Sequence, residues 1–126
     1  MPSNSASPST QVPNIHVIGD ACIGGGMPKS AFAANAQAKV CAIAIADLLA
    51  GRTPATPRLI NTCYSLVAPE YGISVAGVYK PGASGLLADI EGAGGTSPLD
   101  ASPEDRKLEA GYADAWFTTI TSEDFD

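Results

Sequence analysis

The residues from Asn14 to Ala21 read NIHVIGDA, and the interpretation of the fold starts from them. The first five are rich in β-branched side chains, so they predict a short buried strand over residues 14–18. Gly19 closes that strand, because glycine permits the tight turn that follows. A single strand cannot satisfy its own backbone hydrogen bonds, so we expect this one to join a sheet.

A long helix is predicted over residues 28–50, after a loop that contains three consecutive glycines at 24–26. Pro28 suits the first helical turn, where its missing N–H has no cost, and Gly51 stands where a C-terminal cap belongs. Alanine fills much of the segment, and apolar residues surround most of its circumference. We therefore expect a helix buried between layers. Asp47 interrupts the longest apolar run, so no membrane span is predicted.

The remainder of the chain predicts a small antiparallel sheet and one more helix. Three strands and the helix are predicted, in order, at 58–66, 72–79, 86–90 and 103–121. Ser102 is the expected N-cap of that helix, and Asp105 completes a carboxylate version of the capping box. Its apolar side is expected to include Leu108, Tyr112, Ala115, Trp116 and Ile120.

These elements predict an α+β fold in which a strand and a long buried helix, as at the end of a dinucleotide-binding domain, precede a small sheet and a helix. We predict three parts: a disordered lead at 1–12, the strand and helix at 13–52, and the sheet and last helix at 53–126. The lead has neither a basic nor an apolar region, so it is not a signal peptide.

Composition excludes several classes of function. The formal net charge of −6 argues against nucleic acid, whose phosphates an acidic surface repels. Three cysteines, one histidine and no C-x-x-C pair make a structural zinc site unexpected. Cys22, Cys41 and His16 are most simply buried core residues, although Cys22 follows the glycine turn closely enough to approach a ligand there.

The pair Gly19-Asp20 is the first feature with chemical content. Glycine at the end of a strand lets a ligand approach the backbone, and Asp20 can accept hydrogen bonds from the hydroxyls of a sugar alcohol. The start of the following helix adds N–H groups and a partial positive charge. An ordinary turn without a ligand explains the same two residues.

Two groups of residues carry a family resemblance. Residues 17–21 (VIGDA) and 27–30 (MPKS), with Asn35 and Lys39, resemble the second FAD fingerprint of the glutathione-reductase-like flavoproteins. Residues 61–65 (NTCYS) and 70–75 (EYGISV) resemble the flavoprotein subunit of flavocytochrome c sulfide dehydrogenase. On this resemblance, 13–52 is the C-terminal strand and helix of an FAD-binding domain, and 53–126 is the C-terminal domain of that subunit.

The resemblance implies a set of site residues. It implies that Asp20, flanked by Gly19 and Ala21, binds the ribityl chain of FAD. It implies that Pro28, Lys29 and Ser30 lie against the pyrimidine edge of the flavin. It further implies that Cys63 belongs to a redox-active disulfide with an upstream cysteine, and that Trp116 lies near the flavin. Without the resemblance, Cys63 is better explained as an inert buried thiol.

The implied enzyme oxidises sulfide, passes electrons to a c-type cytochrome subunit and is periplasmic. The fingerprint G-x-G-x-x-G and the upstream cysteine are not in this sequence, so we expect a C-terminal part of the flavoprotein, inactive without the N-terminal portion. A different class of function is a non-catalytic fragment that self-associates or pairs with another chain. A quinone-reducing relative is a weaker alternative, since no amphipathic membrane-binding segment is evident.

Overall fold

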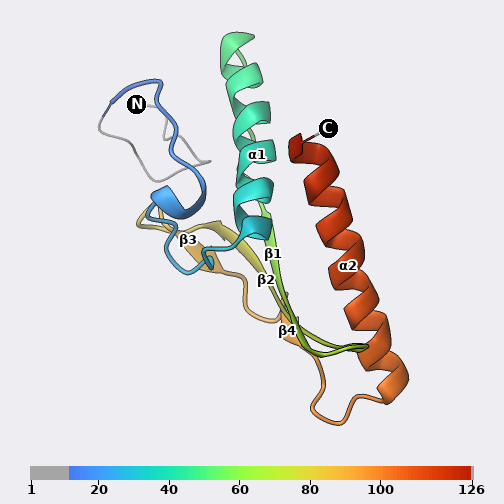
Figure 1. Ribbon diagram of the computed structural model, residues 1–126. Helices are drawn as coiled ribbons and strands as arrows, with labels where there is room; N and C mark the ends of the chain where they lie inside the picture. The colour runs from blue at the N-terminus through green and yellow to red at the C-terminus, as the bar shows by residue number, and fades with distance from the viewer. Residues whose placement is uncertain (1–11, 126) are drawn as a thin grey trace. The chain divides into compact units, whose positions relative to one another are not determined.

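The computed structural model describes residues 12–125 (Figure 1). Its elements are η1 (Gly19–Ala21), α1 (Ala31–Leu49), β1 (Leu59–Ala68), β2 (Tyr71–Pro81), β3 (Leu87–Asp89), β4 (Gly95–Thr96) and α2 (Pro103–Phe125). Two helices and a small antiparallel sheet confirm the predicted α+β class. The predicted lead, except Val12, lies outside the described residues.

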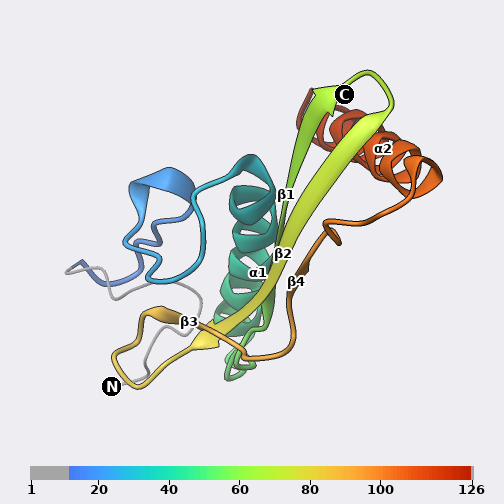
Figure 2. The ribbon, with the colours of Figure 1, turned by 90° about the horizontal axis from the view of Figure 1, so that it is seen from below.

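The sheet has the order β1–β2–β3, and β4 pairs with β2. Figure 2 shows β1 and β2 as two long neighbouring strands joined by a tight turn. Glu70 in that turn has a positive φ of 59°. In the antiparallel register, Tyr79 faces Asp89 and Val75 faces Thr96. The short strand β4 lies within the segment 91–102, which was predicted to be a loop. The sequence did not indicate this strand because two residues are too few to show an alternating pattern.

The described residues divide into two compact units, and each is described by itself. The first contains residues 12–61 and 77–93, and the second contains residues 62–76 and 94–125. The long strands β1 and β2 contribute residues to both. The division predicted from the sequence at residues 52 and 53 stays a prediction.

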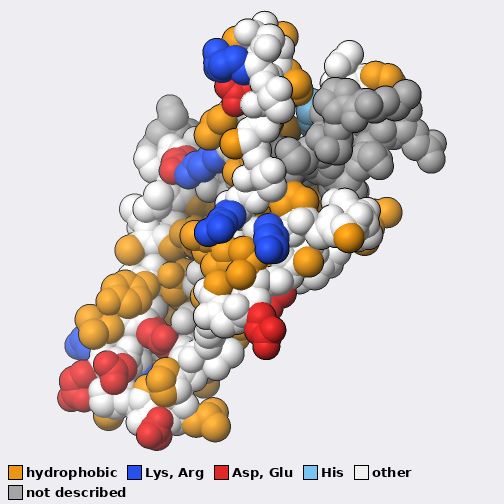
Figure 3. All heavy atoms as spheres, turned by 180° about the vertical axis from the view of Figure 1, so that it is seen from behind, with side chains coloured by type: hydrophobic (Ala, Val, Ile, Leu, Met, Phe, Trp, Pro, Cys, Tyr) orange, Lys and Arg blue, Asp and Glu red, His pale blue; other side chains and the backbone are white. Residues whose placement is uncertain are grey.

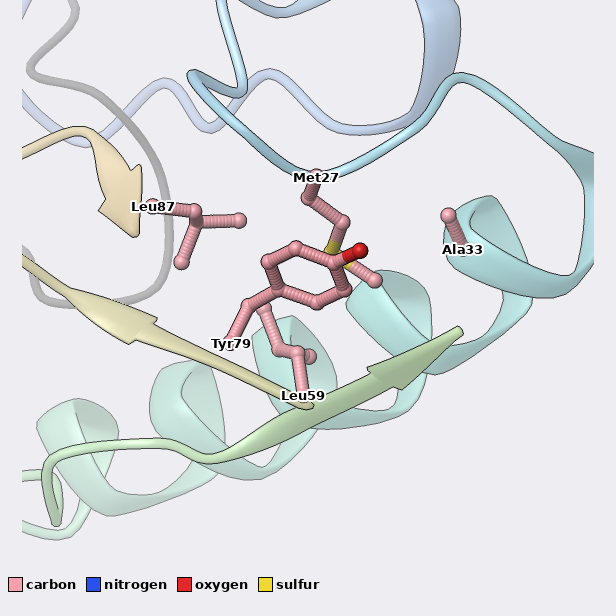
Figure 4. Packing of buried hydrophobic residues seen from close by; sticks show 5 residues of the cluster. All are labelled: Met27, Ala33, Leu59, Tyr79 and Leu87. Atoms are coloured by element: carbon pink, nitrogen blue, oxygen red, sulfur yellow. The ribbon is translucent and has the colours of Figure 1, made fainter. Parts of the chain in front are cut away.

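The core of the first unit lies where α1 meets the sheet. It consists of Met27, Ala33, Leu59, Tyr79 and Leu87, which converge in Figure 4. The glycine-rich loop packs on β3, since Gly26 N–H donates to the carbonyl of Leu87 at 2.8 Å. A Cβ at Gly25 would lie 2.5 Å from that same oxygen. Glycine is therefore required at position 25 by a close backbone approach within the fold.

The predicted strand at residues 14–18 is wrong. No strand is formed there; Asn14 has a φ of 65°, and Ile15 is 52% exposed. The segment has β-branched residues typical of a strand, but a strand forms only where a neighbouring strand supplies partners for its backbone hydrogen bonds. The strands of the described sheet pair with one another instead.

The prediction that the long helix is buried all round is also wrong for this chain. Helix α1 buries one stripe, made of Ala33, Gln37, Cys41 and Ala44. Away from that stripe, Ile43 is 65% exposed and Leu49 is 85% exposed. The predicted C-terminal cap is confirmed, because Gly51 has a φ of 71° directly after the helix.

Helix α1 is also the helix among the described residues that is long and apolar enough to cross a membrane by length and composition alone. One such helix is weak evidence for a membrane span, because core helices of soluble proteins also meet these two criteria. Its buried stripe includes the polar Gln37, which makes hydrogen bonds within the chain.

In the second unit, α2 packs against the start of β2. Ser102 and Asp105 form the predicted capping box: Asp105 N–H donates to Ser102 Oγ at 3.1 Å, and Ser102 N–H donates to Asp105 Oδ2 at 3.2 Å. A Cβ at Gly72 would overlap the backbone nitrogen of Ala110, so this glycine lets β2 and α2 lie in direct contact. Figure 3 shows acidic side chains at the end where α2 begins, which suits a helix N-terminus.

The apolar side predicted for this last helix is only partly correct. Leu108 and Tyr112 are each more than half exposed, whereas Arg106 and Ala110 are buried. Arg106 lies over the Tyr71 ring, 5.3 Å from its centroid, and donates to the carbonyl of Pro98. The ring contact, the Nη2 hydrogen bonds and the Glu109 carboxylate 3.8 Å from Nη1 offset part of the cost of burying this guanidinium, whereas its buried Nε has no hydrogen-bond partner among the described residues. The buried side of α2 therefore includes Arg106 and Ala110, whereas Leu108, Tyr112 and Ala115 of the predicted apolar side are exposed.

Candidate functional site

Five of the predicted cofactor-binding residues line one shallow depression in the first unit, with a cavity volume of about 10 Å³. They are Gly19, Asp20, Pro28, Lys29 and Ser30. Ala21 completes the 3-10 turn η1 beside them. Gly24 and Cys22 also line the depression, so its walls come from the glycine-rich loop and the first two turns of α1.

The turn at Gly19 is held against α1. Gly19 has a φ of 66°, a left-handed conformation that favours glycine, and a Cβ there would meet the Ala34 side chain at 3.4 Å. Its N–H donates to Gln37 Oε1 at 2.7 Å. The Asp20 side chain that follows is exposed, and its backbone carbonyl accepts a hydrogen bond from Lys29 Nζ at 2.7 Å. The Lys29 ammonium is therefore held at the backbone of the turn, which also carries the exposed Asp20 side chain.

Ser30 fixes the start of α1 by two hydrogen bonds. Its Oγ accepts from Ala33 N–H at 3.0 Å, which makes it the N-cap, and donates to Asn61 Oδ1 at 2.5 Å. Asn61 lies in β1 and is only 1% exposed. The first turn of α1 contains no acidic residue, so the positive end of the helix is not neutralised there. The helix start and Lys29 together favour negative charge at the depression.

The residues present fit one edge of a flavin. The ribityl hydroxyls require an acceptor such as the Asp20 carboxylate, and the carbonyl groups of a pyrimidine ring require donors such as Lys29 and a helix N-terminus. The missing Cβ atoms of Gly19 and Gly24 face the protein, since a Cβ would lie 3.4 Å from Ala34 Cβ and 3.6 Å from Cys22 Sγ, respectively. The depression itself is shallow, with a cavity volume of about 10 Å³ that holds about one water molecule, so the chemistry of the polar groups and not the size of the space supports the fit.

Gln37 is a site residue that the sequence analysis missed. It is 5% exposed, lines the depression and contacts the glycine turn. The residues chosen from the same helix were its neighbours Asn35 and Lys39. The available signal was position: Gln37 follows Ala33 by four residues and precedes Cys41 by four, so it is the polar member of a buried helical stripe.

Cys63 and Trp116 belong to the second unit and are not among the residues that line the depression. Both are half-buried, Cys63 in β1 and Trp116 in α2. Because side chains alternate along a strand, Cys63 and Asn61 share one face of β1. The roles of these two residues therefore rest on the family resemblance, and the geometry of the depression gives no information about them.

The other two cysteines are buried, each 6% exposed, as the sequence predicted. Burial raises the pKa of the Cys41 thiol above its ordinary value, so Cys41 is held in its unreactive protonated form. The Cys22 thiol donates to Gln37 Oε1 across 3.7 Å, which places it at the wall of the depression. His16 is half-buried, and its Nδ1 has no hydrogen-bond partner.

A second hollow, of about 330 Å³, lies in the second unit along α2. Pro98, Leu108 and Tyr112 form its apolar wall, and Asp105 and Glu109 its polar wall. Glu109 is occupied by the fold, because Ser97 Oγ lies 2.7 and 2.6 Å from its two carboxylate oxygens. This hollow contains none of the residues that the sequence analysis selected as site residues.

Comparison with known families identifies this chain. The profile of the family described as flavocytochrome c sulphide dehydrogenase, flavin-binding, matches residues 55–125, which is more than half of the sequence. The chain belongs to that family, and its cofactor is a flavin, with FAD the usual form. The matched region contains Cys63 and Trp116. The residues that line the depression precede it.

Proposed function

We propose, from the membership of this chain in the flavocytochrome c sulfide dehydrogenase flavin-binding family, that it supplies the flavin-side part of an FAD-dependent enzyme that oxidises sulfide. The observation that carries the proposal is the depression in the first unit. There Asp20, Lys29 and the Ser30-capped start of α1 line one shallow depression and offer the acceptor and donor groups that one edge of a flavin requires.

Each of these groups has a distinct task in the proposal. Asp20 accepts hydrogen bonds from the ribityl hydroxyls, and the backbone at Gly19 and Ala21 lies alongside. Lys29, Ser30 and Pro28 lie against the pyrimidine edge, where the helix start and the ammonium favour negative charge. When bound, FAD accepts an electron pair and releases electrons singly, which is the chemistry needed between a thiolate and a c-type haem.

Cys63 is the proposed reactive residue, as one half of a disulfide with an upstream cysteine. Hydrosulfide attacks one disulfide sulfur: a new sulfur–sulfur bond forms, the old one breaks, and the second cysteine leaves as a thiolate that carries the electron pair. The proton of hydrosulfide stays on the persulfide or passes to solvent. Trp116, in the same matched region, is proposed to lie near the flavin.

The proposed electron acceptor is a c-type cytochrome subunit, and the proposed compartment is the periplasm. The net charge of −6 supports an encounter with a basic partner. A covalent haem on the partner subunit would take the electrons one at a time.

A second candidate function is a non-catalytic fragment that associates with itself or with another chain. The exposed apolar residues of α1 favour it, among them Ile43 and Leu49. Sedimentation of the purified chain distinguishes the two: a stable monomer at all concentrations argues against the association function.

The proposed chemistry is tested by Cys63→Ser in the flavin-loaded protein that contains this sequence. We expect the variant to bind flavin normally and to lose sulfide-dependent bleaching of the flavin absorbance, because serine cannot form the disulfide. Cys41→Ser is the matched control, since Cys41 is buried and protonated in α1, and it should bleach as the unmodified protein does. Bleaching of the Cys63→Ser protein at an unchanged rate would refute the role of Cys63.

A further inference from the structure

Gln37 is a polar side chain in an otherwise apolar buried stripe. The other members of that stripe on α1 are Ala33, Cys41 and Ala44, and Gln37 itself is 5% exposed. An amide removed from water destabilises a fold unless its hydrogen bonds are replaced. The contacts that replace them therefore indicate what the residue does.

All the contacts of the Gln37 amide lead to the loop that frames the depression. Its Oε1 accepts from Gly19 N–H at 2.7 Å and from the Cys22 thiol at 3.7 Å. Its Nε2 donates to Met27 Sδ at 3.6 Å. One amide group thus reaches the beginning of the loop at Gly19, its middle at Cys22 and its end at Met27.

The two ends of this loop carry the groups assigned to the flavin. Asp20 directly follows Gly19, and Pro28 and Lys29 directly follow Met27. Glycine adopts the left-handed φ of 66° at position 19 without strain, so the conformation itself does not need Gln37. The Gln37 bond to Gly19 N–H instead fixes where this turn lies against α1, and so where Asp20 lies relative to Lys29.

We infer that Gln37 is a positioning residue of the flavin site, which sets the spacing of the Asp20 turn from the Lys29-Ser30 helix start without touching the flavin chemistry itself. The inference rests on the proposed function, because the ligand whose edge is positioned is the flavin. A purely structural glutamine would stabilise the fold and leave the bound flavin unaffected.

The test replaces Gln37 with Met, which fills a similar volume and removes the amide. In the 126-residue chain, hydrogen exchange at the Gly19 amide should become about tenfold faster, as expected for a lost hydrogen bond in a partly buried turn. In the flavin-loaded protein, the flavin absorption spectrum should shift, and the dissociation constant for sulfite, which adds to flavins with an electron-poor ring, should rise several-fold.

Two variants act as controls. Cys41→Ser changes the same buried stripe one turn further along and should alter neither measurement. Gln37→Glu keeps an acceptor for Gly19 N–H and should preserve slow hydrogen exchange at that amide. Only hydrogen exchange is measured for this variant, because the added negative charge would itself alter the flavin spectrum. Should Gln37→Met not fold, Met27→Leu replaces it, since it removes the Nε2 contact and should shift the spectrum in the same direction.

The positioning role alone is overturned if the exchange rate of the Gly19 amide is unchanged in Gln37→Met. It is also overturned if Asp20→Ala and Lys29→Met shift the flavin spectrum and Gln37→Met does not. If none of the three variants affects the flavin, the proposed function fails and the inference fails with it. Faster exchange together with a flavin shift in Gln37→Met, and neither in Cys41→Ser, supports the inference.

Discussion

Ser30 shows how much of this fold depends on single hydroxyl groups. One oxygen caps α1 and also reaches the buried Asn61 in β1. A cap alone satisfies an N–H at a helix end, whereas this one also satisfies an amide that has little access to water. The same residue lines the depression, so stability and the site share it.

Replacing Ser30 with Ala should destabilise the chain by about 2–3 kcal/mol, since it removes a cap and also a donor to a buried amide. Ser102→Ala is the matched variant, because Ser102 caps α2 from an exposed capping box, and it should cost about 1 kcal/mol. Urea unfolding followed by circular dichroism measures both. Equal losses would show that the Ser30–Asn61 bond contributes nothing.

The buried thiol of Cys41 should make stability depend on pH in the alkaline range. Its folded-state pKa is raised by burial, so above about pH 8.5 the unfolded chain ionises this thiol while the folded chain keeps the proton. The unfolded state then gains stability, and the free energy of unfolding should fall as pH rises. The free energy of unfolding of Cys41→Ser should fall less steeply between pH 8 and 10 than that of the unmodified chain. If the two free energies fall in parallel with pH, burial does not raise the pKa of Cys41.

Among the elements, α2 and β2 approach each other through a glycine. A Cβ at Gly72 would overlap backbone atoms of Glu109 and Ala110, which cannot move aside as a flexible side chain could. Gly111, one residue further along α2, has open space around it. The two glycines thus differ in what a methyl group would meet.

Gly72→Ala should therefore destabilise the second unit by about 1–3 kcal/mol through overpacking, and more if the backbone cannot shift. Gly111→Ala should stabilise it by about 0.5–1 kcal/mol, because alanine is the better helix former. Thermal unfolding of the two variants gives changes of opposite sign. A neutral Gly72→Ala would mean that β2 and α2 do not pack as closely as described.

The elements also show what could be predicted from the sequence. Local signals were sufficient for the long strands and both helices: alternation marked β2, and Ser102 with Asp105 marked the start of α2. Burial was harder, because it depends on what each element meets. The segment 14–18 has a strand pattern without a partner strand, and α1 has an apolar surface that the described residues only partly cover.

The site shows the same distinction. Gly19, Asp20, Lys29 and Ser30 stand close to one another in sequence, so their resemblance to a fingerprint was enough to select them. Gln37 stands 18 residues from Gly19, and only the folded chain brings its amide to the turn. Asn61 was quoted as part of a motif, but its bond to Ser30 could not be foreseen from spacing.

At the scale of the whole molecule, the assigned residues fall into both units. The depression belongs to the first unit, and Cys63 and Trp116 belong to the second, within the region that matches the flavin-binding family. In the proposed complex, the depression receives the ribityl and pyrimidine edge of FAD.

An experimental structure of the flavin-loaded protein that contains this sequence tests that claim most directly. The account predicts flavin density against Gly19-Asp20 and Lys29-Ser30, with the Asp20 carboxylate within hydrogen-bonding distance of a ribityl hydroxyl. Gln37 should still accept the Gly19 N–H in that structure. Flavin bound elsewhere, with Asp20 facing solvent, would contradict the account.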